Sequence, residues 1–133
     1  MFTGLVTDVG EIRSVKPSAN NLSRITIFCA YPRAELAQGA SIACSGVCLT
    51  VVGAGEEGGR TWFAADAGAE TLRLTTAGAW RPGAKLNLER ALKIGDELGG
   101  HLVSGHVDGV GETIDRHPDG DSLRIRLLSA SAM

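Results

Sequence analysis

The sequence predicts an all-β domain, either a closed β-barrel or a β-sandwich. About six short segments in the first 100 residues have strand-like patterns, and turn residues separate them at intervals of roughly 8–12 residues. The chain contains 18 glycines, roughly twice the average share of ~7%, which favours tight turns and a small core. A closed barrel also removes the exposed edges that so small a sheet would otherwise leave.

The strands are expected in chain order from alternating apolar side chains and from the turns between them. The segment 53–58 matches the pattern G-x-G-x-x-G, but a strand follows it and its two glutamates would repel a phosphate. We therefore expect a hairpin loop there and no dinucleotide site. The expected elements are strands at 5–15, 23–29, 41–44, 47–52, 61–63 and 84–88, with a turn at 16–21 and a short helix at 32–37.

Composition excludes several classes of protein. The length of 133 residues suits one domain, and 44% hydrophobic residues with a mean hydropathy of +0.07 fit neither a disordered nor a membrane-spanning chain. Thirteen basic residues against fifteen acidic ones, without a basic cluster, predict no nucleic-acid partner. Three cysteines are too few for a disulfide framework and fit a reducing, cytoplasmic location.

An internal repeat divides the chain. Residues 2–12 align without a gap with residues 103–113, and residues 23–27 align with residues 123–127 after the loss of one residue. Pro17 and Pro118 occupy the same place in the intervening turn. We therefore expect one complete domain at 1–100, followed at 101–133 by the first hairpin of a truncated second repeat.

Residues 98–109 combine two histidines, a serine and an aspartate with several glycines, which let a backbone approach a ligand closely. From spacing alone, this segment fits either a ligand site or a glycine-rich connector. Cys44 and Cys48 with His101 and His106 lack the spacing of a structural zinc site, and a buried cysteine packs well as a small hydrophobe. We expect no metal.

Five motifs, in this order over residues 1–109, resemble riboflavin synthase: MFTGLV at 1–6, GVCLTV at 46–51, ETLRLT at 70–75, NLERA at 87–91 and GGHLVSGHVD at 99–108. The resemblance implies a six-stranded Greek-key β-barrel, here with an incomplete second barrel repeat. It also implies an enzyme without a cofactor or metal that converts two molecules of 6,7-dimethyl-8-ribityllumazine, by transfer of a four-carbon unit, to riboflavin and 5-amino-6-ribitylamino-uracil.

Family members of full length form trimers in which each site lies between two barrels of neighbouring subunits. For an isolated barrel we expect a homodimer, because the patch normally covered by a second barrel is exposed. Since half of each site would be missing, we expect this chain to bind ligand with little turnover. Two other hypotheses stay open: a non-catalytic lumazine- or flavin-binding module, and a structural domain that has lost the ligand.

The resemblance also assigns site residues. Cys48 and His106 are the expected catalytic residues, and an imidazole that titrates near pH ~6.5 suits the relay of a proton from the acidic 7-methyl group. Cys48 and Thr50 point to one side of a strand and meet the ring, while the segment 66–71 contacts the ribityl chain. The full set of expected substrate-binding residues is Gly4, Leu5, Val6, Cys48, Leu49, Thr50, Asp66, Ala67, Gly68, Ala69, Glu70, Thr71, Gly105, His106 and Val107.

Overall fold

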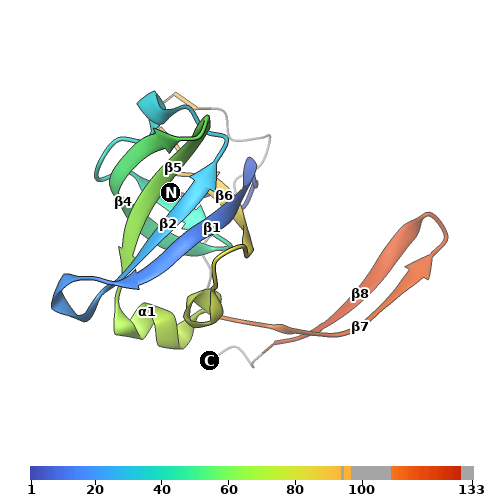
Figure 1. Ribbon diagram of the computed structural model, residues 1–133. Coiled ribbons are helices and arrows are strands. Elements are labelled where there is room, and N and C mark those ends of the chain that lie inside the picture. Colours follow the sequence, from blue (N-terminus) through green and yellow to red (C-terminus); the bar gives the residue numbers. More distant parts are fainter. Residues whose placement is uncertain (94, 97–108, 130–133) are drawn as a thin grey trace.

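Six antiparallel strands close into a barrel in the computed structural model, which describes residues 1–93, 95–96 and 109–129 (Figure 1). The order around the barrel is β1-β2-β5-β4-β3-β6, so the predicted Greek-key barrel is confirmed. The bounds are β1 Asp8–Pro17, β2 Ser23–Cys29, β3 Ser41–Cys44, β4 Val47–Glu57, β5 Arg60–Ala67 and β6 Lys85–Arg90.

The bounds of β1, β4, β5 and β6 differ from the sequence prediction, and the later end of β4 has a clear physical reason. The segment 53–57, expected as a loop, continues β4 and pairs with β5, and the turn is made by Gly58 and Gly59, both with positive φ. Glycine adopts this backbone conformation without strain, so the hairpin turns at the later pair. The strands at 23–29 and 41–44 were predicted with their observed bounds.

The barrel interior is filled by side chains that alternate along each strand. On β4, Val47, Leu49 and Val51 are buried, whereas the intervening Cys48 and Thr50 are exposed. Apolar burial of this kind is the main stabilising contribution to such a fold. The largest fully buried side chains are Phe63, Ile12, Ile25, Ile27, Ile42, Leu88, Val51 and Cys44.

Short helices connect the strands. The 3₁₀ helix η2 (Arg33–Glu35) lies inside the segment predicted as a short helix, and η1 (Ala19–Asn21) lies in the predicted turn. The helix α1 (Ala69–Leu74) and the 3₁₀ helix η3 (Thr76–Ala79) link β5 to β6 and were not predicted. Among the described residues, no helix has the length and apolar character needed to cross a membrane.

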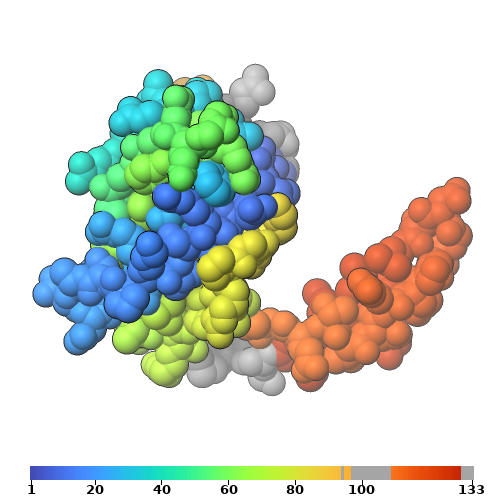
Figure 2. Space-filling model, viewed as in Figure 1, coloured from blue at the N-terminus to red at the C-terminus, as the bar shows by residue number. Residues whose placement is uncertain are grey.

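A separate two-stranded sheet follows the barrel. Strands β7 (Glu112–Asp119) and β8 (Ser122–Leu128) pair with each other and with no barrel strand. The hairpin stands apart from the barrel in Figures 1 and 2, and all of its residues are exposed.

Candidate functional site

The expected ring-binding residues of β4 divide between the two faces of the strand. Cys48 and Thr50 are exposed on the outer face of the barrel, which agrees with their predicted common side. Leu49 is only 4% exposed and packs in the core, so its side chain lies on the opposite face. Only the backbone of Leu49 is therefore available to a ligand on the outer face.

Neighbouring strands extend this outer face. Cys48 pairs with Ala43 on β3, and Ala43 pairs in turn with Glu89 on β6. Because paired residues in an antiparallel sheet point to the same face, these three side chains form a row across three strands. We call Glu89, Ala43 and Cys48 the outer row.

The N-terminal segment lies against one end of the outer row. The Glu89 carboxylate accepts hydrogen bonds from the Thr3 backbone amide (2.6 Å), the Thr3 hydroxyl (2.9 Å) and the Gly4 amide (3.0 Å). Gly4 has a φ of +86°, a conformation that glycine adopts readily. Leu5 and Val6 follow with exposed side chains, so these three expected site residues lie beside β6.

A cavity of about 320 Å³ joins the N-terminal segment to the β3–β4 turn. Its size is at the lower end of the range of small-molecule sites. It lies next to Cys48, whose pairing partner Ala43 forms part of its wall. The lining residues are Gly4, Val6, Ala43, Ser45, Gly46, Asn87, Leu88 and Glu89.

Asp66 lies on the other side of Thr50. Val51 on β4 pairs with Ala65 on β5, and both are buried, so Thr50 and Asp66 occupy the adjacent positions on the outer face. Asp66 forms a bidentate ion pair with Arg24 on β2, with two N–O distances of 2.9 Å. The hydrogen bond from Arg24 and its charge hold the pKa of Asp66 below its usual value. The side chain is therefore an ionised acceptor, as a contact to a polyol requires.

The rest of the expected ribityl segment is divided. Ala67 is 1% exposed and faces the core, which leaves its side chain no access to the outer face. Gly68 is the N-cap of α1, and Ala69, Glu70 and Thr71 form its first turn. Glu70 lies 3.9 Å from Arg73 on the surface of this helix.

The expected residues Gly105, His106 and Val107, and His101, lie outside the described residues. Gly109, Val110 and Gly111, which follow these residues, line a cavity of about 420 Å³ together with Ser45 and Val47. This cavity therefore lies at the turn that leads into Cys48.

Cys44 and Cys48 cannot face one ion from their positions in the barrel. Cys44 is fully buried inside, where burial raises the pKa of its thiol to about 12 and keeps it protonated, while Cys48 is exposed outside. Cys44 thus has the role of a small core residue, and of this pair only the Cys48 thiol is accessible from the outer face.

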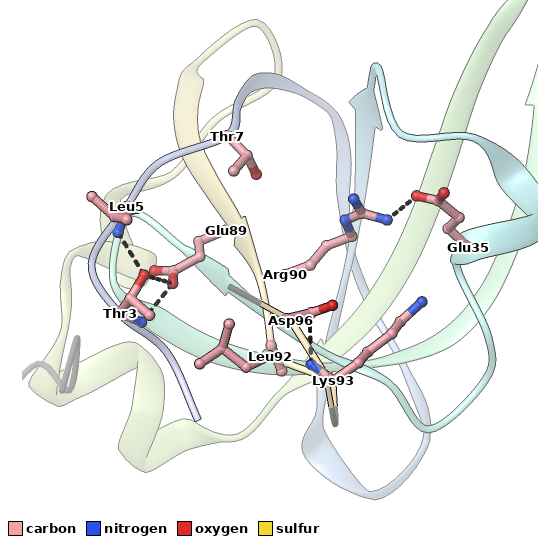
Figure 3. A pocket seen from close by; sticks show the side chains of 10 residues that line it. Thr3, Leu5, Thr7, Glu35, Glu89, Arg90, Leu92, Lys93 and Asp96 are labelled. Carbon is pink, nitrogen blue, oxygen red and sulfur yellow. Dashed lines mark hydrogen bonds and ion pairs between the residues drawn. The ribbon is translucent and has the colours of Figure 1, made fainter. Parts of the chain in front are cut away.

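Sequence reasoning missed a further polar cavity of about 430 Å³ at the end of the barrel near η2 (Figure 3). Several of its charged groups have partners. The Arg90 guanidinium pairs with Glu35 and lies 4.6 Å from the centre of the Tyr31 ring, and Asp96 accepts from the Lys93 amide at 2.7 Å. The same cavity is also lined by Thr3, Leu5 and Glu89, so it adjoins the N-terminal segment on the side away from Gly4 and Val6.

The closed barrel and the cavities on its outer face define a small β-barrel ligand-binding domain. The family model "Lumazine binding domain" matches residues 3–91. The chain therefore belongs to the lumazine-binding domain family, and its predicted resemblance to riboflavin synthase is confirmed.

Curated relatives support the same assignment. The chain is 52% identical over 128 residues to riboflavin synthase of Brucella abortus (strain 2308), which covers 96% of the chain and 63% of that protein. It is 45% identical over 118 residues to riboflavin synthase of Mycobacterium bovis, covering 89% of the chain and 57% of that protein. The chain thus spans less than two thirds of the length of these relatives.

Solved structures support the fold. The crystal structure of LumP complexed with riboflavin has a TM-score of 0.69 and 26% sequence identity, covering 96% of this chain and 66% of that chain. LumP complexed with 6,7-dimethyl-8-(1'-D-ribityl) lumazine matches with the same TM-score and identity and covers 68% of that chain.

Proposed function

We propose that the barrel binds 6,7-dimethyl-8-ribityllumazine and riboflavin on its outer face, at the outer row and the adjoining Thr50 and Asp66. One observation carries the proposal. The pairing of β3, β4, β5 and β6, together with the N-terminal segment, brings Gly4, Cys48, Thr50 and Asp66 to one face of the barrel. Structural relatives in complex with the same two compounds support it.

In this site the pteridine ring lies against Cys48 and the N-terminal segment. The Thr50 hydroxyl donates to a ring carbonyl, and the Gly4-Leu5-Val6 backbone offers polar groups to the ring edge. The ionised Asp66 accepts hydrogen bonds from ribityl hydroxyls while Arg24 keeps it oriented. His106 relays the proton of the 7-methyl group.

We further propose that the whole protein is a riboflavin synthase. Two lumazines react with their rings opposed: one gives a four-carbon unit to the other, which yields riboflavin and 5-amino-6-ribitylamino-uracil. Neither a metal nor a cofactor takes part. The second ring needs a second barrel, and the β7–β8 hairpin is the first part of such a barrel. In the family, the second barrel of each site belongs to a neighbouring subunit of a trimer. The chain alone, as a monomer or a homodimer, therefore has little or no turnover.

Fluorescence titration tests the binding proposal. The wild-type chain should quench or shift the emission of 6,7-dimethyl-8-ribityllumazine and of riboflavin in a saturable way at micromolar protein. Thr50→Val should weaken binding by about five- to ten-fold, because it removes one hydrogen bond. Thr61→Val is the control, because Thr61 lies on β5 at the end opposite to Asp66 and away from the proposed site. It should leave affinity unchanged. Absence of saturable binding by a folded chain would refute the proposal.

The riboflavin assay separates the enzyme from a non-catalytic binding module, which the likeness to LumP favours as the second candidate. Riboflavin formation should be at background for this chain alone and should rise when a fragment carrying the complete second barrel of a riboflavin synthase is added. Binding without any turnover in the mixture would favour the non-catalytic module.

A further inference from the structure

We propose that Glu89 is a positioning residue that holds the N-terminal segment 3–6 in place for ligand binding; this rests on the proposed function. Glu89 and Thr3 are each only 7% exposed, although Glu89 lies on the outer face of the barrel. The N-terminal segment covers the carboxylate. Burying a carboxylate has a large free-energy cost unless its oxygens accept hydrogen bonds. The amide and hydroxyl donors of the N-terminal segment supply these bonds to Glu89.

Both carboxylate oxygens are used by two consecutive residues. Oε1 accepts from the amide and the hydroxyl of Thr3, and Oε2 accepts from the amide of Gly4. The Thr3 hydroxyl, which donates to Glu89, in turn accepts from the Leu5 amide at 3.2 Å. Figure 3 displays this chain of contacts from Glu89 through Thr3 to Leu5. One side chain thus fixes the backbone of three successive residues.

Little else fixes this stretch of backbone. Residues 3–6 belong to no helix or strand, and the flanking backbone bonds are those of Thr7 to Leu88 and of Leu92 to Met1 (both 2.9 Å). Leu5 and Val6 are 44% and 52% exposed, so packing holds them only in part. Gly4 and Val6 form one wall of the cavity of about 320 Å³, and the position of this wall therefore depends on Glu89.

Glutamine keeps the size of the side chain but replaces one acceptor oxygen with an NH₂ donor. That donor would face the Gly4 amide or the Thr3 donors, so at least one hydrogen bond is lost. The segment can then leave β6 while the barrel core stays intact. Ligand affinity falls in proportion to the fraction of molecules in which the segment is still in place.

Titration with riboflavin, followed by its fluorescence, tests this. Glu89→Gln should weaken binding by about ten-fold or more, the size expected for a lost charge-assisted hydrogen bond. Thr3→Val should also weaken binding, and Thr3→Ser, which restores the hydroxyl, should recover it. Glu57→Gln is the matched control: its carboxylate pairs with Arg13 at 2.9 Å, at the opposite end of β4 from Cys48, and its loss should leave riboflavin affinity unchanged.

A chain lacking residues 1–6 distinguishes positioning from direct contact. In that background Glu89→Gln should cause no further loss of affinity, whereas a further loss would mean that Glu89 touches the ligand and would overturn the proposal. A lowered unfolding midpoint with unchanged affinity would make Glu89 merely structural and would overturn it as well.

Hydrogen exchange gives a readout that needs no ligand. The Thr3 and Gly4 amides should exchange slowly in the wild-type chain and rapidly in Glu89→Gln. If the wild-type chain binds no riboflavin while this exchange difference is observed, the proposed function fails but the anchoring by Glu89 stands. Equal exchange in both chains contradicts the anchoring itself.

Discussion

The β1–β2 hairpin inside the barrel and the β7–β8 hairpin outside it pair in the same way. Each has one register shift, between Ile12 and Ser14 in β1 and between Thr113 and Asp115 in β7. These positions correspond at the repeat offset of 101 residues. The local sequence therefore determines the pairing and the bulge even though no further strand pairs with this hairpin among the described residues, and this supports the proposal that residues 101–133 begin a second repeat.

The two hairpins differ in burial. Ile25 and Ile27 are fully buried, whereas the corresponding Ile125 and Leu127 are 51% and 66% exposed. The first hairpin is flanked by β5 and β6, and the second has no flanking strands among the described residues. Burial thus comes from the neighbouring strands, and a two-stranded hairpin alone is at best marginally stable in water.

The presence or absence of a neighbouring strand also determines which carboxylate the corresponding arginines pair with. Arg24 reaches across to Asp66 on β5, whereas the corresponding Arg124 pairs with Asp119 of its own hairpin at 2.7 Å. Without a neighbouring strand, the arginine takes the nearest local carboxylate. The comparison indicates that β7–β8 has the sequence of a barrel hairpin without barrel neighbours.

The largest expected effect is on the free energy of unfolding, when one corresponding apolar residue in each hairpin is shortened to alanine. Ile27→Ala should lower the free energy of unfolding of the barrel by about 2–5 kcal/mol, because it leaves a cavity in the core. Leu127→Ala should change it by less than about 0.5 kcal/mol, because Leu127 is already exposed. Urea denaturation of both variants measures this; equal costs would mean that the second hairpin is packed as tightly as the first.

A smaller effect is expected at the paired glycines. A Cβ on Gly10 would come within 2.7–2.8 Å of Leu88, Ile27 and the Phe28 carbonyl, so Gly10→Ala should destabilise the barrel by about 1–3 kcal/mol. At Gly111 the same atom meets only the Leu128 carbonyl, at 3.2 Å, and Gly111→Ala should cost much less. Thermal unfolding followed by circular dichroism compares them, and a Gly111→Ala barrel as unstable as Gly10→Ala would contradict this account.

The smallest effect is the pH dependence of the Arg24–Asp66 pair. Because the pKa of Asp66 is lowered in the folded state, the pair stabilises the barrel above the unfolded pKa of ~3.9 and loses this contribution as the pH falls through the lower folded value. Asp66→Asn should remove that part of the acid sensitivity, less than about 1 kcal/mol for a pair this exposed to solvent. Unfolding curves between pH 5 and 2 measure it. Asp119→Asn should leave the barrel curves unchanged, and an equal effect of both variants would rule out this assignment.

Much of the barrel could be predicted because its signals are local. Alternation predicted the strands around Ser45 and Gly46, and both residues take the positive φ of a tight turn. The helix α1 was missed because six residues are too short for a helical periodicity to stand out.

The site could be predicted in part. Alternation places Cys48 and Thr50 on one face of β4 and therefore Leu49 on the other, and the structure shows that the side chains of Leu49 and Ala67 face the core. Glu89 was missed as a functional residue because its partner Thr3 lies 86 residues away. The NLERA motif at 87–91 contains Glu89, but only the structure shows that Leu88 and Glu89 are buried on opposite faces of β6.

Hydrogen exchange with and without bound 6,7-dimethyl-8-ribityllumazine tests the central claim, that the first barrel carries the ligand site on its outer face. Slower exchange on binding is expected for amides of residues 3–6 and 41–50, because ligand binding suppresses local opening. The amides of β7 and β8 should be unaffected. Protection confined to residues 112–128, or no protection in residues 41–50 at saturating ligand, would contradict the account.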